Sequence, residues 1–342
     1  MIRFARCSGI VVVAWILVWG GAACGPRSID AGFLPLSGPY LGQTPPGPKP
    51  QIFAPGIVST GMYERDLAMT PDGQEIYFGV TSPSFSYSVI MVTKQVDGHW
   101  TAPEVAPFSG NPDHQDLEPF ITPDGKRLLF LSTRPTNPEE ETGNEDIWVV
   151  DRNGDGWGEP YNLGPPVNTE NGEFFPSVTR DGTLYFSRTY REDQRNVVCR
   201  ARWENGSFAE PEELPAEVNS GRAQYNAFIA PDESYIVLGV YGRDDSFGHT
   251  DYYVSFRNPD DTWIGPVNLG DQVNTAGGRE YSPYVSPDGR YFFFMSSRMA
   301  ETDGSPTPRW TYARLKEEHG LPGNGNADIY WMDASFIEEL RP

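Results

Sequence analysis

The sequence predicts an all-β chain folded as a single β-propeller of five four-stranded blades. The first observation is a short turn phrase, such as Thr70-Pro71-Asp72-Gly73, that occurs five times. The period of its aspartates, 52, 57, 51 and 56 residues, is typical of propeller blades. The aspartates are Asp72, Asp124, Asp181, Asp232 and Asp288. The second observation is that every unit holds four short β-rich segments separated by Gly, Pro, Asn and Asp, without a helical pattern.

Each unit repeats the same order of segments. The turn is followed by an apolar run, residues 76–80 in the first unit and 291–295 in the last, which predicts the second strand. The third strand is predicted to begin at Asp146, Asn196, Asp251 and Asp328 in units two to five. An aromatic residue, a proline and an asparagine then mark the fourth strand. In the second unit these residues are Trp157, Pro160 and Asn168.

The last unit ends at Pro342, before a fourth strand could form. Residues 50–59 precede the first repeat at the spacing of a fourth strand. We therefore predict that this segment pairs with the last blade, closes the ring and removes two exposed strand edges. The alternative is six blades. That would require residues 32–61 to form a whole blade, although they hold too few β-branched or aromatic residues for four strands.

Two phrases carry a resemblance to a known family. Residues 280–294, Glu-Tyr-Ser-Pro-Tyr-Val-Ser-Pro-Asp-Gly-Arg-Tyr-Phe-Phe-Phe, and residues 145–150, Glu-Asp-Ile-Trp-Val-Val, resemble the TolB-type propeller repeats. This WD-repeat-like class is common in bacterial envelope proteins. The resemblance covers roughly residues 50–335 and implies the propeller fold. It also implies a binding or scaffolding surface, since such repeats serve many functions and are sometimes attached to enzymes.

The N-terminus predicts export. Arg3 and Arg6 precede an apolar run over residues 10–19, and small residues then lead to Cys24. This pattern predicts cleavage before Cys24 and lipidation of its thiol, which would place a lipoprotein in the periplasm or on the outer surface. The alternative is ordinary cleavage after Ala23 without a lipid.

The predicted organisation has three parts: a signal peptide over residues 1–23, a tether over residues 24–49 and the propeller over residues 50–342. The tether prediction depends on composition, because residues 25–50 contain five Gly and seven Pro.

Charge and missing motifs limit the classes of partner and reaction. The formal net charge is −21, and nucleic acids or anionic membrane surfaces need basic partners. Neither is expected, except for membrane contact through a lipid anchor. We expect a monomer whose partner is an envelope protein or a glycan. The sequence lacks the motifs of serine nucleophiles, phosphate loops and zinc sites, and Cys199 is interpreted as a buried, inert thiol.

Candidate ligand-binding residues lie on one face. We call the face with the Pro-Asp-Gly turns the bottom, and the face with the loops between strands two and three the top. Eight residues before each repeated aspartate, polar side chains are expected at the top of the axis: Glu64, Asp116, Glu173, Gln224 and Glu280. The structural alternative is a ring of ion pairs with Arg134, Arg188, Arg243 and Arg298. Trp310 is a further candidate, in a long loop with a predicted helix over 308–320.

The expected function is binding or scaffolding without catalysis. The alternative is a glycan-cleaving enzyme that uses two carboxylates from the set Asp66, Asp116, Glu118 and Glu173. No cofactor is expected. The alternative there is a divalent cation such as calcium, held by Asp113, His114, Asp116 and Glu118.

Overall fold

The computed structural model describes residue 33 and residues 36–137, 139, 143–300 and 309–342. The predicted signal peptide over residues 1–23 and the predicted lipidation site Cys24 lie outside the described residues. Residues 35–342 form one compact unit. Within the described part of the chain, no helix is long and apolar enough to cross a membrane.

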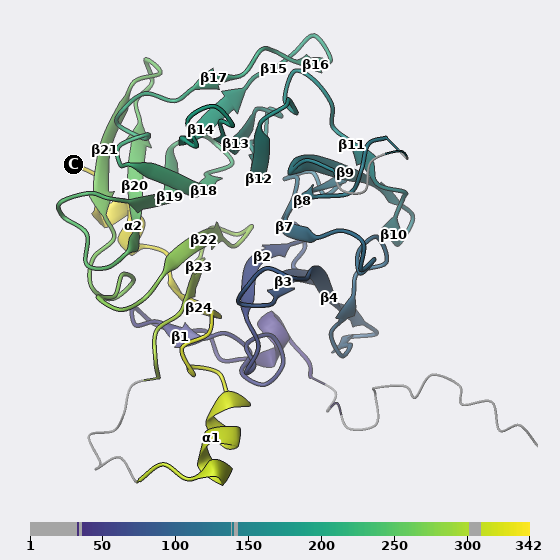
Figure 1. Cartoon of the computed structure of the whole chain (residues 1–342), viewed down its shortest axis with the longest axis vertical. Helices are drawn as coiled ribbons and strands as arrows, with labels where there is room; N and C mark the ends of the chain where they lie inside the picture. The colour runs from purple at the N-terminus through teal and green to yellow at the C-terminus, as the bar shows by residue number, and fades with distance from the viewer. Residues whose placement is uncertain (1–32, 34–35, 138, 140–142, 301–308) are drawn as a thin grey trace, which may run out of the picture. The chain divides into compact units, whose positions relative to one another are not determined.

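Five antiparallel sheets surround a common axis and confirm the five-bladed propeller (Figure 1). The first strands lie nearest the axis: β2 (Glu64–Met69), β7 (Asp116–Ile121), β12 (Gly172–Val178), β18 (Ala223–Ile229) and β22 (Glu280–Val285). The second strands are β3 (Glu75–Thr81), β8 (Arg127–Ser132), β13 (Leu184–Thr189), β19 (Tyr235–Tyr241) and β23 (Tyr291–Ser296). The third strands are β4 (Ser88–Val96), β9 (Asp146–Asn153), β14 (Asn196–Ala201), β20 (Thr250–Arg257) and β24 (Asp328–Asp333). The fourth strands are β6 (Glu104–Val105), β11 (Tyr161–Asn162), β17 (Glu212–Glu213), β21 (Trp263–Asn268) and β1 (Gln51–Ile52).

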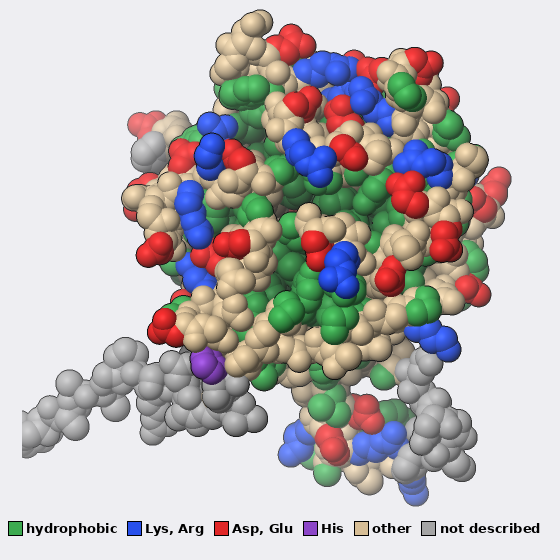
Figure 2. All heavy atoms as spheres, turned by 180° about the vertical axis from the view of Figure 1, so that it is seen from behind, with side chains coloured by type: hydrophobic (Ala, Val, Ile, Leu, Met, Phe, Trp, Pro, Cys, Tyr) green, Lys and Arg blue, Asp and Glu red, His purple; other side chains and the backbone are tan. Residues whose placement is uncertain are grey.

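Blades 1 to 5 are numbered in chain order, and short elements accompany them. These are the hairpin strands β5 (His99–Trp100), β10 (Gly156–Trp157), β15 (Trp203–Glu204) and β16 (Ser207–Phe208), and the helices η1 (Tyr40–Gly42), α1 (Tyr312–His319) and α2 (Phe336–Glu339). Figure 2 shows apolar side chains gathered towards the centre of one face, with acidic and basic side chains interspersed around them.

The repeated aspartate closes the turn between the first two strands. In blade 1, Asp72 Oδ1 accepts hydrogen bonds from the Thr70 hydroxyl (2.6 Å) and the Gln74 backbone N–H (3.0 Å). Burial opposes ionisation here, but the hydrogen bonds, that of Thr70 first, lower the pKa of Asp72 below its usual value. Gly73 follows with a φ of 69°, a left-handed conformation that favours glycine.

The asparagine of the fourth-strand signal binds the edge of the third strand. Asn168 Oδ1 accepts the Ile147 backbone N–H (3.0 Å), and its Nδ2 donates to the Ile147 carbonyl (2.8 Å). Asn219 and Asn274 bind their own third strands in the same way. The amide thus satisfies both backbone groups of one residue, which gives this repeated position a structural role.

The ring closes as predicted. β1 pairs antiparallel with β24, with Gln51 opposite Trp331. Phe53, the residue after β1, is fully buried. Its ring centroid lies 5.1 Å from that of Phe293 and 5.2 Å from that of Trp331. The N-terminal strand therefore completes blade 5 through both backbone pairing and aromatic packing.

Residues 36–49, which the sequence predicts as tether, instead pack against the propeller. Trp100 of blade 1 donates its Nε1–H to the Gly38 carbonyl (2.7 Å). Leu41 is only 3% exposed, and Tyr40 packs against aromatic rings of blade 5. The packing of Tyr40 and Leu41 therefore fixes this segment on the propeller, although its Pro- and Gly-rich composition predicts a flexible tether.

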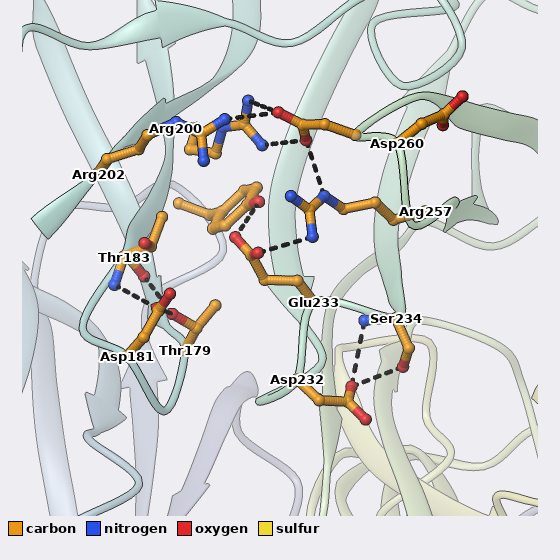
Figure 3. A network of polar contacts seen from close by, with 12 residues as sticks. Thr179, Asp181, Thr183, Arg200, Arg202, Asp232, Glu233, Ser234, Arg257 and Asp260 are labelled. Carbon is orange, nitrogen blue, oxygen red and sulfur yellow. Dashed lines mark hydrogen bonds and ion pairs between the residues drawn. The ribbon is translucent and has the colours of Figure 1, made fainter.

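An ion-pair network joins blades 3 and 4 at the bottom (Figure 3). Three arginines converge on the carboxylate of Asp261: Arg200 at 2.8 Å, Arg202 at 2.6 Å and Arg257 at 2.8 Å. Arg257 also pairs with Glu233 at 2.9 Å. The hydrogen bond from Arg200 is the main cause that holds the pKa of Asp261 far below its usual value.

We expect Asp261→Asn to lower the free energy of unfolding by about 1–2 kcal/mol at neutral pH. Three guanidinium groups lose their shared carboxylate, although partial exposure of Asp261 screens the effect. Because the pKa of Asp261 is lowered in the folded state, its contribution is present above the unfolded pKa of about 4 and is lost at lower pH. Urea unfolding at about pH 7 and pH 3 measures both effects. Asp260→Asn is the control, since the described hydrogen bonds to the Asp260 side chain come from Thr262; equal losses in the two variants would contradict the network's role.

Candidate functional site

Every first strand carries a bulge at the same place. The strand register shifts in all five blades, and the residue at the shift has a φ between 50° and 74°. These residues are Asp66, Glu118, Phe175, Asn226 and Ser282. A bulge inserts an extra residue and re-aims side chains, and a left-handed φ is costly for these residue types. Its recurrence in every blade marks the bulge as a common feature of the ring.

Four of these residues meet Arg65 at the axis, and we call these five side chains the axial network. Arg65 Nη2 donates to Glu118 Oε1 (2.7 Å), and Arg65 Nε lies 2.6 Å from Asp66 Oδ2. Asn226 Nδ2 donates to Glu118 Oε1 (3.2 Å) and to Ser282 Oγ (3.0 Å). The Ser282 hydroxyl donates to Asp66. Blades 1, 2, 4 and 5 are therefore joined by polar contacts at the centre.

Glu118 is the central acceptor of the axial network. It is 5% exposed, and its Oε2 accepts the Phe175 backbone N–H (2.8 Å), which adds blade 3 to the contacts. Burial raises the pKa of Glu118 to about 8, although the Arg65 guanidinium and the Phe175 N–H act in the opposite direction.

A cavity of about 730 Å³ opens on the top face above the axial network. Each first strand contributes the residue just before its bulge: Arg65, Leu117, Phe174, Tyr225 and Tyr281. Amide and hydroxyl side chains line it higher up: Gln115, Thr133, Thr189, Gln194 and Asn196. The Arg65 guanidinium lies over the Tyr281 ring at 4.7 Å from its centroid. The wall thus combines aromatic faces with hydrogen-bonding groups.

Charged groups from opposite parts of the ring reach the cavity. Glu145 comes from the loop between strands two and three of blade 2, and Arg279 from the link into blade 5. Among the described residues, neither side chain has a hydrogen-bond or ion-pair partner. Burial raises the pKa of Glu145. Sequence reasoning missed both residues, because the residue type at each of these positions differs from repeat to repeat.

The five predicted ligand-binding residues of the first strands are buried and do not line the cavity. Their side chains bind residues of the link that precedes each first strand, and two of them also bind a serine of the second strand: Glu64 to Thr60, Asp116 to Ser109 and Ser132, Glu173 to Thr169, Gln224 to Gly221, and Glu280 to Thr275 and Ser296. Successive residues of a strand point to opposite faces. The residues that line the cavity therefore lie one position after the predicted residues in each first strand.

The ion-pair alternative is confirmed in two blades. Arg134 pairs with Asp116 and Arg188 with Glu173, each at 2.8 Å. In blade 4, Arg243 pairs with Asp245 instead, at 2.9 Å. In blade 5, Arg298 donates to the Ser296 hydroxyl and to backbone carbonyls of the preceding link.

The residues suggested for a cation are not brought together. His114 Nε2 lies 3.7 Å from Asp116 Oδ2, but both Asp116 oxygens already accept hydrogen bonds. Glu118 belongs to the axial network, and the side chain of Asp113 contacts neither oxygen of Asp116 in the described contacts. Within the described ranges, no group of three or more His, Cys, Asp and Glu is placed to hold a metal ion.

The predicted helix in the long loop of blade 5 is present as α1. Thr311 caps its N-terminus by accepting the Arg314 backbone N–H (3.2 Å), and Gly320 follows its last residue. Trp310 is 52% exposed, and the Arg314 guanidinium lies over its ring at 4.4 Å. Trp310 therefore packs on α1 and does not line the cavity.

Buried acids without an arginine partner should make the protein less stable as pH rises. Burial raises the pKa of Glu64 to about 7 and that of Asp328 to about 6, and each carboxylate leaves one buried oxygen unbonded among the described residues. The folded state then binds more protons than the unfolded state between about pH 4.5 and 7. Stability is therefore expected to fall as pH rises through this window.

Glu64→Gln should remove part of this pH dependence, because the amide does not titrate. Thermal unfolding at several pH values between about 5 and 8 measures the slope. Glu75→Gln is the matched control: Glu75 has a lowered pKa, through Arg152 and Tyr77 against the effect of burial, so its loss should destabilise the protein at pH 8. A slope unchanged by Glu64→Gln would contradict this assignment.

No protein-family model matches the chain. SH3 domain-binding protein 2 of Mus musculus is 25% identical over 163 residues, 47% of this chain and 28% of that protein, so the chain spans less than a third of this relative's length.

Three similar solved structures represent two kinds of protein. TolB from Acinetobacter baumannii is 17% identical, with a TM-score of 0.44, over 80% of this chain and 57% of that chain. Bacillus subtilis arabinanase Arb43A is 11% identical, with a TM-score of 0.47, over 80% and 95% of the two chains. A GH62 hydrolase in complex with xylotriose is 10% identical, with a TM-score of 0.45, over 81% and 91%. Similarity at this level concerns the propeller fold alone.

Proposed function

We propose that this chain is an exported propeller of the TolB-type repeat class that binds a glycan in its axial cavity without cleaving it. The supporting observation is the composition of the cavity wall, which combines three aromatic side chains of the first strands, Phe174, Tyr225 and Tyr281, with amide and hydroxyl groups. A cavity of about 730 Å³ lies within the size range of ligand sites. Aromatic rings can cover the apolar faces of sugar rings, while the amides and hydroxyls can pair with sugar hydroxyl groups.

Binding is favoured over catalysis by the state of the carboxylates. The four residues suggested as acid and base all contact an arginine: Asp66 and Glu118 share Arg65, Asp116 contacts Arg134, and Glu173 contacts Arg188. Glycoside hydrolysis needs one carboxyl group that gives up a proton and a second that is free to act as nucleophile or base. Of these four residues, only Glu118 lines the cavity, and its oxygens accept from Arg65, Asn226 and Phe175.

A glycan array probed with residues 25–342 tests the proposal, followed by calorimetry on the best ligand. Tyr225→Ala should weaken binding about tenfold or more, since it removes an aromatic wall of the cavity. Tyr161→Ala is the matched control, because Tyr161 is 40% exposed on an outer strand and does not line the cavity. Binding that Tyr225→Ala leaves unchanged, or that is absent across the array, would overturn the proposal. Release of shortened glycans would support the enzyme instead.

We further propose that Cys24 carries the lipid that anchors the mature chain to the envelope. Cys24→Ser should release the protein into the soluble envelope fraction, because acyl chains contribute about 0.8 kcal/mol per buried CH₂, and a formal net charge of −21 does not favour binding to an anionic membrane surface. Fractionation followed by immunoblotting measures this release. Unchanged membrane association of the variant would argue against lipidation.

A further inference from the structure

On the bottom face, a groove runs between each pair of neighbouring blades, and this chain's own side chains fill it at four junctions. Between blades 1 and 2, Arg152 forms a bidentate pair with Glu75 (2.9 and 2.8 Å), and Trp157 Nε1–H donates to the Tyr77 hydroxyl (2.8 Å). Between blades 3 and 4, the Asp261 network has the corresponding place (Figure 3).

The two chain ends fill two further grooves. Between blades 4 and 5, Phe336 of α2 packs on Phe292, and the Arg341 guanidinium lies over the Phe256 ring at 4.4 Å. Between blades 5 and 1, the N-terminal segment lies along the groove and makes a tight turn at η1, Tyr40–Gly42. Its Leu36 and Gly38 carbonyls accept from the backbone N–H and Nε1–H of Trp100 (2.8 and 2.7 Å).

Tyr40 anchors this N-terminal peptide in its groove. Its ring centroid lies 5.0 Å from that of Tyr291 and 5.4 Å from that of Trp331. It also lies 6.2 Å from that of Phe293, and its hydroxyl donates to Asp288 Oδ2 at 3.3 Å. The fold itself therefore shows how such a groove binds a peptide segment that inserts one aromatic side chain from a tight turn.

Between blades 2 and 3, the described residues leave a cavity of about 390 Å³. It is lined at the positions that surround Tyr40 in the other groove. The counterparts of Asp288, Tyr291, Phe293 and Trp331 are, in that order, Asp124, Arg127, Leu129 and Val149. Phe208 also lines it and corresponds to Trp100 in the repeat. The smaller Leu129 and Val149 leave room where blade 5 has two large rings.

We infer that the groove between blades 2 and 3 binds a peptide segment of a partner protein, through a tyrosine next to an acidic residue. Asp124 has the place of the carboxylate that accepts the Tyr40 hydroxyl. Trp203 and Phe208, with ring centroids 4.8 Å apart, offer an aromatic wall to the inserted ring.

The charges of this groove select the residue beside the tyrosine. Lys126, Arg127 and Arg180 line the cavity, although the chain as a whole has a formal net charge of −21. The two lining carboxylates, Asp124 and Asp181, each use Oδ1 to accept hydrogen bonds from their own turn. Lys126 pairs with Asp124 at 3.5 Å and Arg127 with Asp151 at 3.3 Å, but the side chains of both pairs are largely exposed. Such exposed pairs are weak, so the Arg127 guanidinium can also bind a carboxylate of the peptide, whereas the groove that binds Tyr40 has an uncharged Tyr291 in place of Arg127.

A peptide designed on the N-terminal segment tests the inference. The probe is a fluorescein-labelled octapeptide of residues 36–43 with the change Pro39→Glu, and its binding to residues 25–342 is followed by fluorescence anisotropy. We expect Arg127→Glu and Trp203→Ala to weaken binding at least tenfold. A peptide with alanine in place of its tyrosine should bind at least tenfold more weakly to the unchanged protein.

The matched control is Arg290→Glu. Arg290 is an exposed arginine at the start of the second strand of blade 5, beside the groove already filled by Tyr40, and its change should leave peptide binding unaltered. Thermal unfolding of each variant checks that the fold is kept. Weakening by Arg290→Glu in place of Arg127→Glu would assign the peptide to the Tyr40 groove and overturn the inference. No anisotropy change up to roughly 1 mM protein would also overturn it.

Discussion

Deletion of residues 25–60 is expected to abolish cooperative folding of the propeller. The deletion removes β1, so that β24 loses its outer partner and the ring is left with exposed strand edges. It also removes Phe53 from its place against Phe293 and Trp331. Loss of one such buried ring costs about 3–5 kcal/mol, a large share of the 5–15 kcal/mol that stabilises a typical domain. Circular dichroism melting and size-exclusion chromatography measure the loss.

Two shorter deletions distinguish ring closure from a general effect of truncation. Removal of residues 25–35 leaves every described contact of residues 36–60 in place and should not change the melting temperature. Removal of residues 25–45 deletes Tyr40 and the buried Leu41 but keeps β1, so an intermediate melting temperature is expected. Equal melting temperatures for the 25–45 and 25–60 deletions would contradict closure by β1.

The architecture could be predicted from the sequence because its causes are local and repeated. The turn around Asp72 is set by hydrogen bonds within five residues, and it recurs at a blade-like spacing. Closure of the ring could also be predicted, because the last repeat lacks a fourth strand and the segment over residues 50–59 precedes the first repeat at the spacing of a fourth strand. The place of residues 36–49 could not, because composition alone does not show that Tyr40 and Leu41 have partners in blades 1 and 5.

The site was harder to predict than the fold because it depends on strand orientation to within one residue. The sequence identified the right strands but selected Glu64 and Glu280, which point away from the cavity, instead of Arg65 and Tyr281, which line it. The repeated polar positions are buried and hydrogen-bonded to neighbouring residues, whereas the cavity wall differs in chemistry from blade to blade. The bulge at Asp66 and its equivalents could not be recognised in the sequence, because five different residue types adopt the same left-handed φ at this position.

Arg65→Met is expected to lower the free energy of unfolding by about 3–5 kcal/mol at neutral pH. Arg65 is 4% exposed and is the cation that both Asp66 and Glu118 contact in the axial network. Removing Arg65 leaves the buried carboxylate of Asp66 without its cation and the buried carboxyl group of Glu118 without one of its hydrogen-bond donors, which accounts for a loss of this size. Arg290→Met is the control, because Arg290 is exposed and lies outside the network.

The loss of unfolding free energy in Arg65→Met should also depend on pH, and the titration of Glu118 determines whether the loss grows or shrinks as pH rises. Burial already raises the pKa of Glu118 to about 8, and the Arg65 guanidinium is the main group that opposes this rise. Without Arg65, the pKa of Glu118 rises further, so the folded variant holds the proton more firmly than the unfolded chain does. Its stability relative to the unchanged protein should then fall as pH rises. Urea unfolding at about pH 6 and pH 9 measures the difference, and a deficit of equal size at both values would indicate that Arg65 stabilises the axis by packing on Phe85 and Tyr281 alone.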